Sequence, residues 1–164
     1  MKKMYAIMLS LIFLAAAVQH SRAHCEIPCG IYGDKMRIDM LNEHLDTIEK
    51  SMNMIMELQK ANTVNYNQLV RWITNKESHA NEFQHIVTQY FMTQRIKLVD
   101  NNDVEKQKKY TSEVTMLHEM LVYAMKTKQT TDLNHVKTLR DLVKKFSKSY
   151  FSEADLKHLK EHKD

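Results

Sequence analysis

The segment HCEIPCGIYGD, residues 24–34, contains both cysteines, both glycines and the single proline of the 164-residue chain. If the chain is cleaved before His24, the free α-amine, the backbone nitrogen of Cys25 and its sulfur close two five-membered chelate rings around a metal ion. Pro28 favours a turn that brings back Cys29 as the fourth donor, and the imidazole of His24 can bind above the plane. Two nitrogen and two sulfur donors in a plane suit nickel(II) or copper(II).

Two other chemistries fit the same spacing. Cys25 and Cys29 could form a disulfide, since disulfides are common in exported proteins. Alternatively, a zinc site could combine both cysteines with His24 and a fourth ligand from elsewhere. Covalent haem attachment is excluded, because it requires C-x-x-C-H and the chain has C-x-x-x-C followed by glycine.

Residues 1–23 have the three parts of a secretory signal peptide. Two lysines precede an apolar run over residues 5–18, and small residues stand at the −3 and −1 positions before His24. The apolar run is shorter than the ~20 residues that a membrane-spanning helix needs. We therefore expect an exported protein, periplasmic or extracellular, with no stable membrane anchor. Cleavage itself would create the free amine of the metal site.

Loss of this leader removes most of the chain's net positive charge. Three of the 24 Lys and Arg residues lie within it, which leaves 21 against 20 Asp and Glu. A protein that binds nucleic acid needs a concentrated basic face, so we expect no nucleic-acid partner.

The rest of the chain has the pattern of amphipathic helices. No glycine or proline follows Asp34, which favours helices over strands and turns. Apolar residues spaced three and four apart mark four helical stripes. These stripes are Ile38, Leu41, Leu45, Ile48, Met52 and Ile55; Leu69, Trp72, Phe83, Val87, Tyr90 and Phe91, in a helix from about Tyr66 to Leu98; Tyr110, Val114, Leu117, Leu121 and Ala124; and Leu133, Val136, Leu139, Val143 and Phe146.

Polar segments separate the last three helices. The sequence DNND, residues 100–103, predicts a break and the next N-cap, and a residue in 130–132 caps the fourth helix. Four amphipathic helices with short connections bury their stripes as an antiparallel four-helix bundle. The sequence thus predicts an all-α protein in three parts: a cleaved signal peptide (1–23), an N-terminal metal-binding hook (24–34) and a four-helix bundle (35–164).

The hook closely resembles the metal-binding motif of nickel-containing superoxide dismutases, H-C-x-x-P-C-G-x-Y. The residues that match are His24, Cys25, Pro28, Cys29, Gly30 and Tyr32. Looser similarity continues in RID (37–39), RWITNKESHA (71–80) and LHEML (117–121). The resemblance implies an enzyme that converts superoxide to dioxygen and hydrogen peroxide by cycling a nickel ion between Ni(II) and Ni(III). It also implies a homo-oligomer, a hexamer of four-helix bundles in which each hook packs against neighbouring subunits.

The same resemblance implies roles for individual hook residues. The His24 amine and imidazole, the Cys25 amide nitrogen and sulfur, and the Cys29 sulfur would be the nickel ligands. Tyr32 would order water near the open face of the metal and restrict which small anions approach. A plainer role for Tyr32 is to anchor the hook to the bundle.

Four helical residues are candidates for supporting the site. Arg37 and Asp39 resemble a family Arg-x-acid pair that supports the hook across a subunit boundary, with aspartate in place of the commoner glutamate; otherwise they are ordinary surface charges. Lys76 and His79 continue the apolar stripe of the second helix, where polar groups mark an interface or a site. The alternative is that both residues lie at the solvated edge of the helix. Lys76 could steer an anion, and His79, where some relatives carry arginine, would give a pH-dependent charge.

Two rival functions share parts of this pattern. An exported helical bundle that holds nickel or copper without catalysis would have the same hook. A structural bundle tied by one disulfide would have the same leader and helices. The remaining histidines have no ligand spacing and are interpreted as structural or surface residues; they are His44, His85, His118, His135, His158 and His162.

Overall fold

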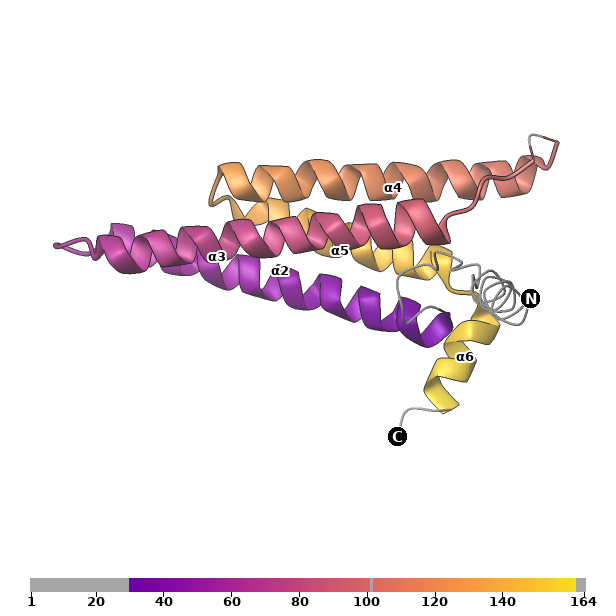
Figure 1. The fold of residues 1–164 in the computed structure, drawn as a ribbon, viewed down its shortest axis with the longest axis horizontal. Helices are drawn as coiled ribbons and strands as arrows, with labels where there is room; N and C mark the ends of the chain where they lie inside the picture. Colours follow the sequence, from indigo (N-terminus) through magenta and orange to yellow (C-terminus); the bar gives the residue numbers. More distant parts are fainter. Residues whose placement is uncertain (1–29, 101, 162–164) are drawn as a thin grey trace, which may run out of the picture.

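The computed structural model describes residues 30–100 and 102–161, and these residues form helices and no strands. The elements are α2 (Ile31–Gln59), α3 (Tyr66–His85), the π-helix η1 (Ile86–Arg95), α4 (Val104–Gln129), α5 (Leu133–Tyr150) and α6 (Glu153–Glu161). Figure 1 shows α2, α3 with η1, α4 and α5 side by side as long rods, with the short α6 turning away at the end of α5. The all-α helical bundle predicted from the sequence is confirmed.

The leader and the first six hook residues, 24–29, lie outside the described part of the chain. The structure does place the end of the hook. Helix α2 begins at Ile31, so residues 31–34 form its first turn rather than a separate segment. The hook is therefore joined directly to the longest helix of the bundle.

Carboxylate caps set the starts of α4 and α5. Asp103 accepts a hydrogen bond from the backbone N–H of Lys106 at 3.1 Å, and Asp132 accepts one from the backbone N–H of Asn134 at 2.9 Å. Each cap satisfies an amide in the first turn that has no partner within the helix. Both helices start where the sequence predicts them.

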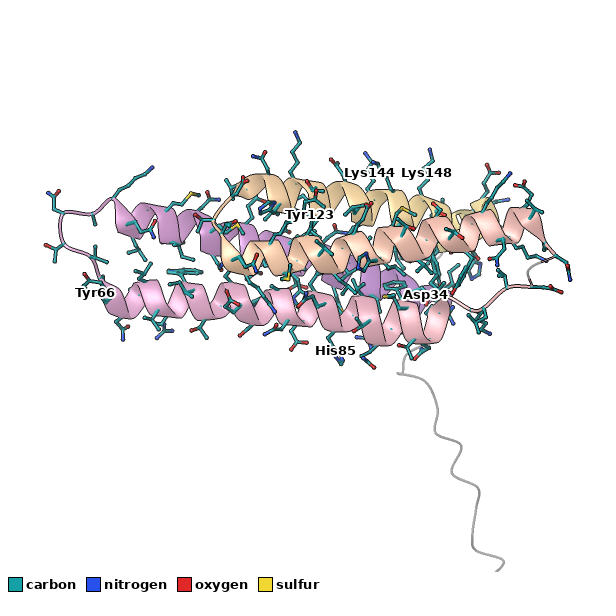
Figure 2. The ribbon with its side chains drawn as sticks, turned by 90° about the horizontal axis from the view of Figure 1, so that it is seen from above. Asp34, Tyr66, His85, Tyr123, Lys144 and Lys148 are labelled. Carbon is teal, nitrogen blue, oxygen red and sulfur yellow. The ribbon has the colours of Figure 1, made fainter. Side chains whose placement is uncertain are left out.

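Every helix of the four-helix bundle contributes one stripe to the hydrophobic core. Its buried members are Ile38, Leu41, Leu45, Ile48, Met52, Ala80, Phe83, Ile86, Val87, Tyr90, Phe91, Leu117, Met120, Ala124, Val136, Leu139, Leu142, Val143, Phe146 and Phe151. The predicted stripes of α2 and α5 lie in or against this core. On α3, Leu69 and Trp72 are only half-buried, because the α2–α3 hairpin extends past the adjacent ends of α4 and α5 (Figures 1 and 2).

The predicted inner face of α4 is partly wrong. Tyr110, Val114 and Leu121 are half-buried, whereas Glu113, Met120 and Thr127 are buried. The two polar groups are tolerated because each has a hydrogen bond: Glu113 accepts from the hydroxyl of Ser149 at 3.0 Å, and the Thr127 hydroxyl donates to the carbonyl of Ala124 at 2.7 Å. A pattern that counts only apolar residues cannot detect such positions.

Helix α3 continues as a π-helix, whose wider turn changes which residues face the core. The N–H of Ile96 donates to the carbonyl of Phe91 at 2.9 Å, five residues back. Tyr90 and Phe91 are adjacent in sequence and both are fully buried, with their rings edge to face at 5.2 Å. This arrangement turns the Tyr90 hydroxyl toward the beginning of α2, where it donates to Asp34.

Lys76 is buried, as its stripe position predicts, and its ammonium group caps the C-terminus of α4. Its Nζ donates to the carbonyls of Thr127 at 2.7 Å, Lys128 at 2.5 Å and Thr130 at 3.4 Å. Carbonyls at a helix C-terminus have no partner within the helix, and lysine is one of the side chains that can supply one. Burial lowers the pKa of Lys76, and the neighbouring carboxylate of Glu77, 3.5 Å away, opposes that effect.

We expect Lys76→Met to lower the free energy of unfolding by about 2–4 kcal/mol, because it leaves buried carbonyls without donors. Denaturant titration followed by circular dichroism measures the change. Lys108→Met is the control: it makes the same change at an exposed lysine of α4 that pairs with Glu105, for which we expect a change of at most ~1 kcal/mol. Equal losses from the two variants would contradict the capping role of Lys76.

Candidate metal centre

Gly30 joins the hook to α2 through a backbone conformation that suits glycine. Its φ is 98°, in the left-handed region that residues with a side chain rarely adopt. Its carbonyl accepts the backbone N–H of Asp34 at 2.8 Å, which is the first helical hydrogen bond of α2. This backbone conformation explains why the motif has a glycine at this position, where the chain turns into the helix.

Tyr32 is the described candidate that lies nearest in sequence to the predicted ligands. It stands in the first turn of α2 and is 52% exposed. Its hydroxyl lies 2.9 Å from Nε2 of His158 on α6, and the two tilted rings have centroids 5.6 Å apart. Tyr32 is thus held by α6 on one side while about half of its surface stays open.

Asp34 fixes this first turn to the rest of the bundle, at the end where Figure 2 labels it. Its side chain is almost completely buried. Oδ1 accepts the hydroxyl of Tyr90 at 2.7 Å, and Oδ2 accepts Nη2 of Arg95 at 2.6 Å and the hydroxyl of Tyr150 at 2.9 Å. Arg95 also donates from Nε to the Tyr150 oxygen at 3.0 Å. One carboxylate therefore ties α2, η1 and α5 together two residues after Tyr32.

The groups around Asp34 keep their protons over the usual working range of pH. Burial raises the pKa of Tyr90 well above its ordinary value, and the hydrogen bond to Asp34 raises it further. Burial also raises the pKa of Tyr150, to about 12, although the hydrogen bond from Arg95 opposes this. Burial lowers the pKa of Arg95, but its hydrogen bonds to Asp34 and Tyr150 outweigh burial and raise it overall. The network is therefore a fixed anchor and not a proton store.

Arg37 and Asp39 have different surroundings within the chain. Residues two apart on a helix point to different sides. The guanidinium carbon of Arg37 lies 5.0 Å from the centroid of the Tyr90 ring, and Nη1 is 3.7 Å from the sulfur of Met40. Asp39 is exposed and pairs with Lys35, whose Nζ donates to Oδ2 at 2.6 Å. Their support of the hook stays a prediction.

Lys76 and His79 do not lie beside Tyr32 in the same chain. The Nδ1 atoms of His79 and His44 are 2.9 Å apart, with ring centroids at 5.1 Å. His44 is twelve residues after Tyr32 on α2, which is roughly 18 Å along a helix. Lys76 contacts the C-terminus of α4, at the opposite end of the bundle from the start of α2 (Figure 1). Neither residue therefore lies beside Tyr32, and their action on a hook stays a prediction.

Sequence reasoning missed the partners of Tyr32 and the network of Asp34. Asp34 stands four residues before Ile38 and thus continues the apolar stripe of α2, the same signal that singled out Lys76. No spacing connects His158 with Tyr32, or His44 with His79, because both contacts depend on how the helices pack.

The described residues contain no group of three or more His, Cys, Asp or Glu side chains that could hold a metal ion. The candidate ligands are His24, Cys25 and Cys29, which precede Gly30 and lie outside the described part of the chain. An amine, an amide nitrogen and two thiolates suit nickel, because anionic donors of this kind favour its higher oxidation state. The donor set therefore fits a nickel ion, and its geometry stays a prediction.

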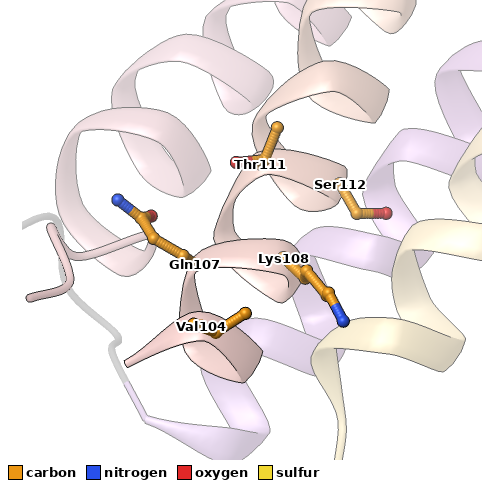
Figure 3. A pocket seen from close by; sticks show the side chains of 5 residues that line it. All are labelled: Val104, Gln107, Lys108, Thr111 and Ser112. Carbon is orange, nitrogen blue, oxygen red and sulfur yellow. The ribbon is translucent and has the colours of Figure 1, made fainter. Parts of the chain in front are cut away.

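The pocket on the outer face of α4 offers no alternative centre for such chemistry. The pocket in Figure 3, about 590 Å³, is shallow and lined by five residues of α4: Val104, Gln107, Lys108, Thr111 and Ser112. None of them is a histidine, cysteine or acid, so this pocket has no transition-metal ligand of the usual kinds.

Within the described residues, no helix combines the length and the apolar character that a membrane span requires.

Comparison with known proteins identifies the family. The model of the family described as nickel-containing superoxide dismutase matches residues 19–154. This stretch spans the hook and the bundle and ends just inside α6. No significant match was found among curated proteins or among solved structures. Because the matched stretch covers most of the chain, the chain belongs to the nickel-containing superoxide dismutases, oxidoreductases that act on superoxide.

Proposed function

We propose that this enzyme is exported, cleaved before His24, and loaded with nickel at the new N-terminus. The amine and imidazole of His24, the amide nitrogen and thiolate of Cys25, and the thiolate of Cys29 are the ligands. The observation that carries this proposal is the family match, which includes these residues. When bound, nickel would supply the one-electron chemistry by which two superoxide ions and two protons become dioxygen and hydrogen peroxide.

The chain itself positions and screens the site. The phenol of Tyr32, open to solvent on one side, orders water and limits which small anions reach the metal. The buried carboxylate of Asp34 fixes the turn that carries Tyr32, so the hook starts from a rigid point. Rigid support by hydrogen bonds outside the ligand set is a general requirement of functional metal sites.

We also propose that the enzyme assembles as a homo-oligomer, a hexamer by family resemblance, in which each hook packs against a neighbouring subunit. Tyr66, Val70 and Ile73 support assembly: they are 72%, 60% and 40% exposed and lie on one face of α3. They stand on the part of the hairpin that extends beyond α4 and α5, where Figure 2 labels Tyr66. An exposed apolar face of this kind marks a protein–protein contact.

The first prediction from this proposal concerns the free α-amine of His24. Nickel-loaded protein that starts at His24 should remove superoxide rapidly in a stopped-flow assay, whereas protein with one extra residue before His24 should not, because the amine is then an amide and a poor ligand. A non-catalytic metal carrier would bind nickel without removing superoxide, and a disulfide-tied bundle would do neither. Slow, equal decay from both proteins would overturn the proposed site.

The second prediction concerns the anchor. Asp34→Asn should lower the free energy of unfolding by about 2–4 kcal/mol, because it leaves the Arg95 guanidinium without its counter-charge, and should lower the activity of the nickel-loaded enzyme. Asp39→Asn makes the same chemical change on the same helix at an exposed pair and should alter stability by at most ~1 kcal/mol. Thermal or denaturant unfolding compares the two, and equal stabilities would contradict the anchoring role.

The third prediction concerns assembly. Val70→Asp should lower the molar mass measured by light scattering after gel filtration, because it places a charge in the apolar face of α3. Val104→Asp is a matched control, since Val104 on α4 is 62% exposed and Val70 is 60% exposed. An unchanged mass for Val70→Asp would remove this face of α3 from the interface.

A further inference from the structure

Among the described residues, the Tyr32 hydroxyl has its polar side-chain partner in the part of the chain beyond the family match. That match ends at residue 154, whereas His158 lies near the end of α6. Nε2 of His158 is 2.9 Å from the Tyr32 hydroxyl, within the usual length of a hydrogen bond. A residue of the hook motif is thus joined to the part of α6 that lies beyond the family match.

Helix α6 is held firmly enough to position this histidine. The backbone N–H and hydroxyl of Ser152 donate to Asp155 at 2.9 and 2.6 Å, and the N–H of Asp155 donates back to the Ser152 oxygen at 3.1 Å. This reciprocal arrangement is a capping box, which stabilises the start of a helix. Phe151, just before the helix, is buried, and Leu159 packs against the core.

The direction of the hydrogen bond decides what Tyr32 presents to an anion. A phenol has a single proton to donate. If Tyr32 donates that proton to Nε2 of His158, only lone pairs face the open side, and lone pairs repel an anion. If Nε2–H of His158 donates to the phenol oxygen, the phenol proton stays available for water or for an incoming anion. The substrate of this family is an anion, so the second arrangement is the productive one.

We propose that His158 is a positioning residue for superoxide dismutation: its Nε2–H donates to the hydroxyl of Tyr32 and turns the phenol proton toward the side from which the anion arrives. The proposal rests on the role of Tyr32 proposed above. It assigns a function to α6, and it makes the site of this enzyme depend on both ends of the chain.

Two substitutions separate the hydrogen bond from the packing of the ring. His158→Gln keeps an N–H donor at similar reach, whereas His158→Phe keeps a ring beside Tyr32 and removes the donor. In nickel-loaded protein that starts at His24, we expect the glutamine variant to stay within about twofold of the wild-type rate and the phenylalanine variant to lose about fivefold, the usual effect of one hydrogen bond.

The same substitutions in a Tyr32→Phe background test whether His158 acts through Tyr32. His158→Phe should then cause no further loss, because the group that it positions is already absent. An equal loss in both backgrounds, or no loss from His158→Phe in either, would overturn the proposal. Rescue by glutamine also distinguishes positioning from a general effect on folding, which unfolding curves of each variant monitor.

A metal-free measurement decides the direction of the bond independently of activity. Long-range proton–nitrogen NMR spectra of protein labelled with ¹⁵N in histidine report which ring nitrogen carries a proton, and the signals of His158 are identified by their loss in His158→Gln. We expect a protonated Nε2 whose signal shifts in Tyr32→Phe. A bare Nε2 would overturn the proposal. If the wild-type enzyme were inactive with nickel, the proposed function would fail while these spectra still tested the hydrogen bond.

Discussion

A single buried carboxylate connects the helix that follows the hook to the rest of the bundle. Asp34 uses both of its oxygens, accepting two tyrosine hydroxyls and one guanidinium from η1 and α5. A buried charge is costly unless such partners satisfy it, so the first turn of α2 has very little freedom to move. The hook ends within this turn, and Tyr32 takes its direction from it. We therefore expect this network to set the direction in which the hook leaves the bundle.

The sequence predicts most of this framework, because helix periodicity and local chelation are both short-range. The spacing of His24, Cys25 and Cys29 predicts a donor set, which stays a prediction, and the stripe of α2 predicts its buried face. The inner face of α4 was predicted only in part: Leu117 and Ala124 are buried as expected, but Glu113 and Thr127 are polar residues with buried hydrogen bonds that the pattern missed. The partners of buried polar groups were out of reach as well: the Asp34–Tyr150 bond spans 116 residues and the Tyr32–His158 bond spans 126.

The two polar residues on the predicted inner stripe of α3 illustrate how differently such positions are used. The ammonium of Lys76 has three donors, and three carbonyls at the end of α4 are within hydrogen-bonding distance of it. Its burial is therefore explained by helix capping, without reference to a substrate. His79 is used differently: its Nδ1 faces Nδ1 of His44 on α2.

The His44–His79 contact constrains protonation at the α2–α3 seam. Two Nδ1 atoms 2.9 Å apart can form a hydrogen bond only if one carries a proton and the other does not. Protonation of both rings would place two positive charges side by side, and burial, followed by repulsion from His79, lowers the pKa of His44. An arginine at residue 79 would remain charged at any working pH. With histidine there, the His44 ring is charged only at acidic pH, because burial lowers its pKa, so the contact is a hydrogen bond and not a fixed charge.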